Sequence, residues 1–174
     1  MFTIIPERPE DAALIDPLLD LSFGPERHQK TVYRLREGIP PIPALSFVVL
    51  DAAGNLQGNI RYWPILIAGR WPAVLLGPLA INPARRGEGM GKALVRNSMD
   101  VAANLGYRLC VLVGDADYYV PFGFHSAVDA GLELPGWVDL SRFLVKELAP
   151  GALAGVRGMI GPPAVKRKRK AARA

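Results

Sequence analysis

Apolar positions along the chain follow two periods, one typical of helices and one typical of strands. Residues 2–5 form a short apolar run, and a helix is expected from 9–22, where apolar residues recur at helical spacing after a proline and two acidic residues. Pro17 lies inside this pattern and argues against one unbroken helix. A second, polar helix is expected over 26–37, and the proline-rich linker 38–43 ends it.

The middle of the chain is dominated by apolar runs separated by short turns. Three strands are expected there, over 45–51, 56–68 and 71–82. An amphipathic helix follows at 90–105, and Gly106 stops it. The run 108–114 is almost wholly apolar, which is typical of a central strand that is buried on both faces.

The last third of the chain has weaker patterning. A short helix or turn is expected at 116–122, and two late strands at about 124–134 and 143–148. Residues 150–163 are rich in glycine, alanine and proline and are expected to cover the surface. No internal repeat divides the chain, so we expect one domain over 1–163 followed by a basic tail over 164–174, expected to be disordered.

The stretch between the third strand and the long helix carries the most chemistry. The strand ends at Asn82-Pro83, the basic turn RRGEGMGK spans 85–92, and the helix begins at about Met90. Glycines let backbone N–H groups approach a ligand closely, and a helix start adds unpaired donors and a partial positive charge. Arg86 and Lys92 add full charges, and the combination suits a pyrophosphate.

Other glycine-rich phosphate motifs fit this turn less well. A Walker A loop needs glycine where Arg86 stands and a hydroxyl residue where Ala93 stands, and a dinucleotide fingerprint needs a third glycine that is missing. The pattern that fits is R-x-x-G-x-G, from Arg86 through Gly89 to Gly91. It resembles the acetyl-CoA pyrophosphate loop of the GNAT N-acetyltransferase superfamily. The alternative is a plain strand–turn–helix connection.

A second marker lies one helix and one strand downstream. The run YYVPFGF resembles the Y-x-x-x-G-F signature of the same superfamily, from Tyr119 to Gly123-Phe124. With RYWP at 61–64 and LVGD at 112–115, the pattern is similar to the YhbS-like branch of small bacterial acetyltransferases. The resemblance covers about residues 1–155. It implies an α/β (mixed α+β) fold, in which a twisted mixed sheet is flanked by helices.

The resemblance also implies acetyl-CoA as co-substrate. Backbone on the strand before the loop would lie along the pantetheine arm, the loop would hold the pyrophosphate, and Tyr119 would lie near the sulfur. The residues expected at the cofactor site are Leu79, Ala80, Ile81, Arg86, Gly87, Glu88, Gly89, Met90, Gly91, Lys92, Tyr119 and Phe122.

Tyr119 is the candidate general acid, because a departing CoA thiolate needs a proton and a phenol near the sulfur can supply it. Tyr118 could take that role or line the pocket, and either tyrosine could simply pack within its apolar turn. The strand 71–82 holds no carboxylate, so a general base is harder to identify. Asp115 is the candidate, acting through a water, although it could equally cap the short helix.

Two acidic residues remain as alternative bases, Asp117 and Glu37. Glu37 could equally be a solvated charge in the last helical turn. The acceptor side is expected to include Tyr33, Arg61 and Trp63, with Phe23 and Tyr62 as further aromatic candidates. Arg61 would suit a carboxylate or phosphate. The acceptor itself is expected to be a small-molecule or peptide amine, since nothing in these segments narrows it further.

Composition sets limits on partners and location. The net charge is +5, but six basic residues after position 165 contribute +6, which leaves −1 for residues 1–165. Nucleic-acid binding is therefore expected only through the tail, if at all. Cys110 is the single cysteine and lies in an apolar run, which predicts a buried thiol and no internal disulfide. The N-terminus lacks a basic region typical of a signal peptide, and no apolar run has the length of a membrane span.

We therefore expect a cytoplasmic monomer or homodimer without membrane contact. Two histidines and one cysteine are too widely separated for a zinc site, so no metal is expected. The leading hypothesis is an acetyl-CoA-dependent N-acetyltransferase. The alternative is a non-catalytic acyl-CoA-binding sensor, which the missing strand carboxylate favours, and a third hypothesis is a nucleic-acid-associated protein that uses the KRKRK tail.

Overall fold

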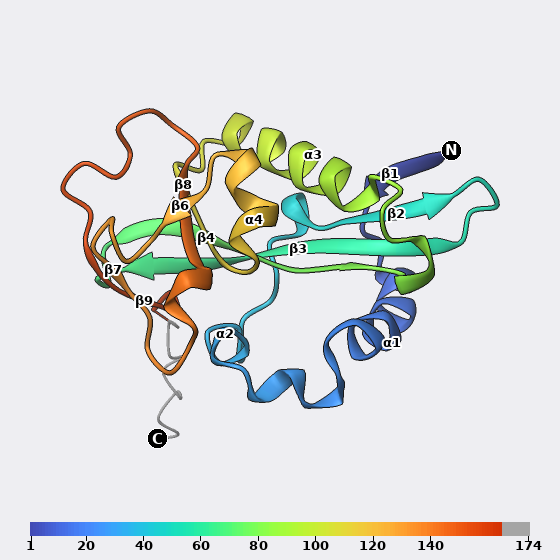
Figure 1. Cartoon of the computed structure of the whole chain (residues 1–174), viewed down its shortest axis with the longest axis horizontal. Coiled ribbons are helices and arrows are strands. Elements are labelled where there is room, and N and C mark those ends of the chain that lie inside the picture. Colours follow the sequence, from blue (N-terminus) through green and yellow to red (C-terminus); the bar gives the residue numbers. More distant parts are fainter. Residues whose placement is uncertain (165–174) are drawn as a thin grey trace, which may run out of the picture.

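The computed structural model describes residues 1–164, and the tail from 165 to 174 lies outside them. Within residues 1–164, nine strands form a mixed sheet whose main order is β1-β2-β3-β4-β5-β8-β6 (Figure 1). Neighbours along this order are antiparallel except β4 and β5, which are parallel. The bounds are β1 Phe2–Pro6, β2 Phe47–Asp51, β3 Leu56–Ile67, β4 Trp71–Ile81, β5 Leu109–Val113, β6 His125–Ser126 and β8 Phe143–Glu147.

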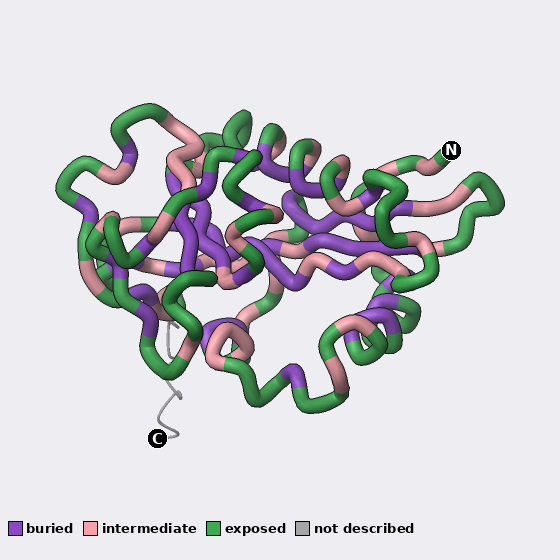
Figure 2. The backbone as a smooth tube through the Cα atoms, in the orientation of Figure 1, coloured by how far each residue is buried: buried purple, intermediate pink, exposed green. Residues whose placement is uncertain are grey.

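Helices cover both faces of the sheet. α3 (Met90–Asn104) and α4 (Ala116–Tyr119) lie on one face, and α1 (Ala12–Phe23) and α2 (Thr31–Arg34) lie on the other (Figure 1). The central strands are buried along most of their length (Figure 2). α3 buries an apolar face that includes Leu94, Val95 and Met99, and each such side chain contributes about 1.5–3 kcal/mol of transfer free energy.

The first long helix is unbroken, contrary to the expectation drawn from Pro17. α1 runs through Pro17 to Phe23, with Ile15, Leu18 and Leu19 buried against the sheet. Pro17 lies on the exposed face, where water can satisfy the carbonyl that loses its helical partner. Packing of the opposite face therefore holds the helix together.

The expected polar helix over 26–37 was wrong. The segment forms a 3₁₀ helix at Pro25–Gln29 and the single α-turn of α2, because Lys30 between them adopts an extended conformation. Its sequence lacks an apolar stripe that would stabilise a longer helix against the sheet. The side chains that it buries are instead Leu35 and two arginines, Arg27 and Arg36.

The late part of the chain also differs from expectation. The single strand expected over 124–134 is two short strands, β6 and β7 (Leu132–Glu133). Within the expected covering segment, β9 (Gly158–Gly161) pairs with β3 and with β7. A four-residue strand that begins and ends with glycine has no alternating pattern, so the sequence could not reveal it. Ile160 is nevertheless completely buried.

Candidate active site

A gap opens in the middle of the sheet, where β4 and β5 separate. The two strands pair only at Val74 with Cys110 and at Leu75 with Val111, although β4 continues to Ile81. On its other side β4 stays paired to β3, with a register shift opposite residues 77 and 78. Backbone from residue 76 onward therefore has no strand partner on the β5 side, as the expected pantetheine site requires.

The loop after β4 presents its main chain to solvent. Gly89 adopts a left-handed conformation, with φ of 85°, and is the N-cap of α3. The first helical bond runs from the N–H of Ala93 to the carbonyl of Gly89, with N and O 3.0 Å apart. The N–H groups of Met90, Gly91 and Lys92 therefore have no acceptor within the helix. These residues all belong to the predicted pyrophosphate site.

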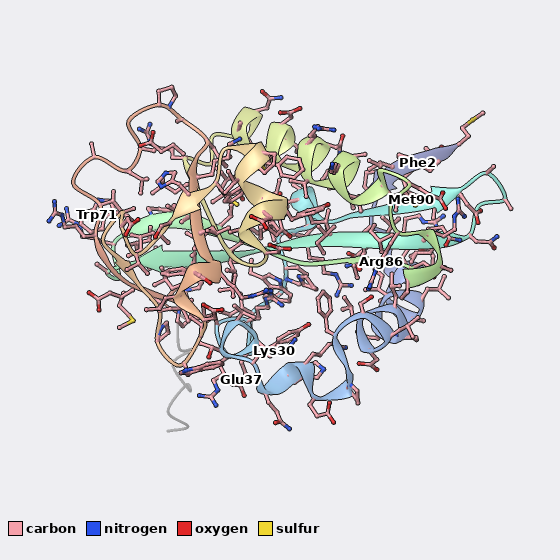
Figure 3. All side chains as sticks on the ribbon, viewed as in Figure 1. Phe2, Lys30, Glu37, Trp71, Arg86 and Met90 are labelled. Atoms are coloured by element: carbon pink, nitrogen blue, oxygen red, sulfur yellow. The ribbon has the colours of Figure 1, made fainter. Side chains whose placement is uncertain are left out.

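Charges around this loop are partly paired. Arg85 forms two hydrogen bonds with Glu88, at 2.6 and 2.7 Å, and lies 3.8 Å from the carboxylate of Asp51. The bonds to Arg85 hold the pKa of Glu88 below its usual range. Arg86 is exposed and has no ion pair among residues 1–164, so its charge remains available to a ligand. Figure 3 shows Arg86 just before α3, which begins at Met90.

A cavity of about 1260 Å³ lies along the gap between β4 and β5. It brings together five residues predicted for the cofactor, catalytic and acceptor sites: Tyr33, Leu79, Arg86, Asp115 and Tyr119. The other predicted cofactor residues do not line this cavity: residues 87–92 form the loop and the first turn of α3, and Ala80, Ile81 and Phe122 pack against the core. Ala80 is buried beneath α1, and Phe122 is buried in the core beside α3.

Tyr119 lies at the wall of this cavity with its ring largely buried. The ring contacts Phe124 edge-on at 5.7 Å between centroids, and its edge lies over Gly114, where a Cβ would come within 2.5 Å of it. Burial raises the pKa of the Tyr119 phenol above the usual tyrosine value, so the group holds its proton at neutral pH. A protonated phenol can donate to a leaving thiolate.

Tyr118 packs beside Tyr119 but reaches a different place. The two rings meet edge-on at 4.9 Å between centroids. The Tyr118 hydroxyl lies over the first turn of α3, where a Cβ on Gly91 would come within 2.7 Å of it. Half-burial raises the pKa of this phenol as well. Tyr118 thus borders the loop at the start of α3, and a side chain at Gly91 would displace it.

Asp115 is exposed at the cavity wall and caps α4. One carboxylate oxygen, Oδ1, accepts a hydrogen bond of 3.0 Å from the N–H of Asp117. The capping role considered from the sequence is therefore present. The other oxygen, Oδ2, has no hydrogen bond within residues 1–164 and can still accept one from water. Capping and proton acceptance are thus compatible in the same side chain.

The predicted acceptor residues gather on the α1 and α2 face. Tyr33, Arg61 and Trp63 line a second cavity of about 370 Å³, and Tyr33 also lines the first one. Arg61 is already bonded at both ends of its guanidinium fork to Glu7, at 2.8 and 2.6 Å. The indole of Trp63 donates to the carbonyl of Gly77, at 2.8 Å.

The remaining candidates for the acceptor site and for the general base lie in different parts of the structure. Tyr62 is completely buried and shares a hydrogen bond of 2.8 Å with Ser98, so it is a core residue. Phe23 is partly exposed and lines the larger cavity. Glu37 is exposed beside the smaller cavity, and Figure 3 shows it with Lys30 on the side of the sheet opposite α3.

Two groups of residues that line the cavities were not predicted from the sequence. The loop before β8 contributes Arg142 and Trp137, a residue that is 88% exposed. Arg36 lines both cavities and is buried. Nothing local distinguishes Arg36 from the other charges of the run RLRE, since its burial depends on packing against β3 and β4. The apolar WV of 137–138 was the one available signal for the loop.

Three further expectations concern the cysteine, metal binding and membrane spans, and each can be compared with residues 1–164. Cys110 is completely buried, as predicted, and burial raises the pKa of its thiol. No group of three metal-ligating side chains occurs within residues 1–164. No helix there combines the length and apolar character needed to cross a membrane.

Known proteins resemble this chain along most of its length, although no family model matches it. The uncharacterized N-acetyltransferase YhbS of Escherichia coli K12 is 34% identical over 157 residues, which cover 88% of this chain and 92% of the relative. The uncharacterized N-acetyltransferase YjhQ of the same strain is 30% identical over 129 residues, 72% of this chain and 71% of the relative.

Two solved structures extend the similarity to the fold. The GNAT family N-acetyltransferase YhbS from Escherichia coli in complex with CoA has a TM-score of 0.80 at 33% identity, over 92% of this chain and 89% of that one. A GNAT family acetyltransferase from Brucella melitensis in complex with acetyl-CoA has a TM-score of 0.67 at 28% identity, over 94% and 97%. The expected twisted mixed sheet flanked by helices is therefore confirmed.

Proposed function

Because the chain belongs to the GNAT N-acetyltransferase family, as its motifs predicted, we propose that it transfers the acetyl group of acetyl-CoA to a primary amine by direct attack in a ternary complex. The family relationship supports an acyltransferase that uses acetyl-CoA as co-substrate. The direct route and the nature of the acceptor are parts of the proposal.

The observation that carries the proposal is a single cavity that reaches three elements. These are the free edge of β4, Arg86 in the glycine-rich loop, and Tyr119. An acyl thioester placed against β4 would have its phosphates at the start of α3 and its sulfur near a phenol. Holding both reactants in one cavity makes the attack effectively intramolecular.

Cofactor binding would rest mainly on the main chain. The free N–H groups of Met90, Gly91 and Lys92 would donate to the pyrophosphate, and the side chains of Arg86 and Lys92 would add charge. Gly87 and Glu88 would contribute backbone only, since the Glu88 carboxylate is bonded to Arg85. Backbone of Leu79, Ala80 and Ile81 would flank the arm, and one N–H of this strand would stabilise the oxyanion.

The chemical step removes two protons from the acceptor nitrogen and places one on the departing sulfur. The amine nitrogen attacks the thioester carbonyl carbon, the tetrahedral intermediate collapses, and the C–S bond breaks to give an amide and CoA thiolate. We assign Tyr119 as the acid that protonates the departing sulfur. We assign Asp115 as the base that accepts one proton from the acceptor ammonium through a water before the neutral amine attacks, using the carboxylate oxygen that does not cap α4. The nitrogen of the tetrahedral intermediate loses a second proton, which restores the Tyr119 phenol.

A screen of primary amines for release of free CoA thiol tests this function. Turnover above the rate of acetyl-CoA hydrolysis with at least one amine is the expected result. Tight acetyl-CoA binding without turnover across a library of small amines, polyamines and peptides would instead favour a sensor. The Tyr119→Phe variant, run in parallel, distinguishes enzymatic transfer from contaminating activity.

A further inference from the structure

Arg36 occupies an unusual position, at the boundary between the two cavities. It follows α2 and packs against the β3–β4 part of the sheet with only 7% of its surface exposed. Buried arginines are almost always paired with a carboxylate. The surroundings of this guanidinium therefore indicate what it is placed to do.

The guanidinium of Arg36 has no anionic partner within residues 1–164. Its Nε and Nη1 atoms are buried and make no hydrogen bond, and no described carboxylate lies within 4.0 Å of it. Two of the other arginines on this face differ in this respect. Arg61 is held by Glu7, and Arg27 contacts Asp16 and Asp20.

Aromatic rings and a glycine hold the guanidinium in place. Its Cζ lies 4.7 Å from the ring centroid of Tyr33 and 5.6 Å from that of Trp63. On β4, a Cβ at Gly77 would come within 3.2 Å of Nη2, and Gly77 has φ of 120°. Because glycine has no side chain, the guanidinium can approach the backbone of β4 at Gly77. The next two residues, Pro78 and Leu79, line the larger cavity.

Burial of this cation is costly without a partner. Desolvation lowers the pKa of Arg36 to about 10, which still leaves the group charged at neutral pH. An unpaired buried charge strongly destabilises the folded state. A ligand carboxylate would offset that cost when it binds, and the planar fork of a guanidinium matches a planar carboxylate at two points.

We propose that Arg36 recognises a carboxylate on the acceptor, so that the substrate is a small amine that also carries a carboxylate group. This inference rests on the proposed acetyl transfer. A guanidinium that has no anionic partner within residues 1–164 and lies beside two aromatic rings matches an acceptor with one negative charge and an apolar body. The assignment moves acid recognition from Arg61, whose fork Glu7 fills, to Arg36 on the same face.

Matched acceptor pairs test the inference. Amino acids and their carboxamides present the same amine and side chain, with and without the charge. The wild-type protein should prefer the acids in kcat/KM. Arg36→Met should raise the KM of the acids about 10- to 100-fold, the scale of a hydrogen-bonded charge pair, and leave the amides and acetyl-CoA affinity little changed. Equal use of acids and amides by the wild type would overturn the proposal.

Arg34→Met is the matched control, because Arg34 lies two residues away, lines both cavities and is exposed. It removes the same charge from the region and should keep the preference for acids. Loss of that preference in both variants would reveal a general field effect and overturn the specific role of Arg36. So would a preference that survives Arg36→Met.

Stability provides a readout that separates binding from packing. Replacing an unpaired buried charge with an apolar side chain of similar length should leave the melting temperature unchanged or raise it. A purely structural arginine predicts a lower melting temperature and an unchanged acid-to-amide ratio. If Arg36→Met does not fold, Arg36→Gln gives the same comparison of acid and amide.

Failure of acetyl transfer would be distinguishable from failure of acid recognition. If no amine is turned over, calorimetric titration of the CoA-loaded protein with N-acetyl amino acids and their amides still tests the site. Carboxylate-dependent binding that is lost in Arg36→Met would retain the anion site and sink the enzyme hypothesis. Turnover of amides as fast as acids would retain the enzyme hypothesis and exclude acid recognition by Arg36.

Discussion

The loop that follows β4 and the segment around α2 border the same cavity, but they present different chemical groups to it. The loop offers backbone N–H groups and exposed charges from seven consecutive residues, 86–92. The α2 segment offers side chains, and its key cation is buried and surrounded by residues from two distant strands. One site is local in sequence, and the other is assembled only by folding.

This difference has consequences for specificity. Main-chain groups recognise a phosphate whatever side chains surround them, so the cofactor site depends on conformation more than on residue type. Side chains such as Arg36, Tyr33 and Trp137 can change without disturbing that loop. We therefore expect substitutions in the two regions to have separable effects, on acetyl-CoA binding in one case and on acceptor choice in the other.

The largest separation is expected from Gly89→Val. Gly89 has φ of 85°, which a β-branched residue rarely adopts, and its N–H neighbours form the expected phosphate site. Acetyl-CoA affinity should fall about 100-fold or more, equal to about 3 kcal/mol, while the domain stays folded. Calorimetric titration of the folded variant measures this effect.

Gly106→Val is its matched control. Gly106 follows the other end of α3, has φ of 88°, and like Gly89 has open space where a Cβ would lie. The two variants carry similar backbone strain, and only Gly89→Val should lose acetyl-CoA. Unchanged affinity in Gly89→Val would remove the loop assignment.

Tyr119→Phe is expected to act at the junction of the two regions. It keeps the ring that packs on Gly114 and removes the hydroxyl, so kcat should fall about 100-fold while the dissociation constants of both substrates change little. Burial raises the pKa of Tyr119, so its proton is lost only above the usual tyrosine range near pH 10. The alkaline limb of the pH–rate profile should flatten or move in the variant.

Tyr118→Phe controls for the loss of a neighbouring hydroxyl. Its hydroxyl lies over the first turn of α3, so the change should be milder in kcat and should show mainly in acetyl-CoA affinity. Wild-type turnover by Tyr119→Phe, on a substrate for which chemistry limits the rate, would exclude Tyr119 as the acid.

A smaller effect is expected from Asp115→Asn, which keeps an oxygen able to cap α4 and removes the carboxylate. If Asp115 accepts the proton through a water, kcat/KM near neutral pH should fall about 10-fold. Melting temperature should be preserved, in contrast to Asp115→Ala, which also loses the cap. A normal rate for Asp115→Asn would leave Asp115 as a cap alone.

The smallest effect is expected from deletion of residues 165–174, which belong to neither region. The tail has no apolar pattern that could pack on the domain, so melting temperature and acetyl-CoA affinity should be unchanged. Any nucleic-acid binding should disappear with the tail and should weaken steeply with salt in the full chain. A lower melting temperature after truncation would show that the tail packs on the domain.

The predictability of each part follows from the same contrast. Strands β2 to β5 and helix α3 could be predicted because strong apolar periodicity coincides with glycine and proline boundaries. The loop could be interpreted because its chemistry depends on glycine spacing. The breaks around α2 and the strand β9 could not be predicted, because short polar or glycine-rich segments take their conformation from tertiary contacts.

The site shows the same limit at the level of single residues. The sequence does not show which of Arg61 and Arg36 is free to bind a ligand. Only the fold reveals that Arg61 is already paired with Glu7, which lies 54 positions away in the chain. Asp115 likewise carried two interpretations, and a cap does not preclude a base. Pairwise contacts across distant parts of the chain decide such questions, and a single sequence does not contain them in readable form.

The most direct test of the account is an initial-velocity study in which acetyl-CoA and an accepted amine are varied together. One cavity that holds both substrates for direct attack predicts double-reciprocal lines that intersect. Isotopically labelled acetyl-CoA should leave no acetyl group on the protein when the amine is omitted. Parallel lines, together with a labelled protein, would contradict direct transfer and show that an acetylated side chain carries the group between the two regions.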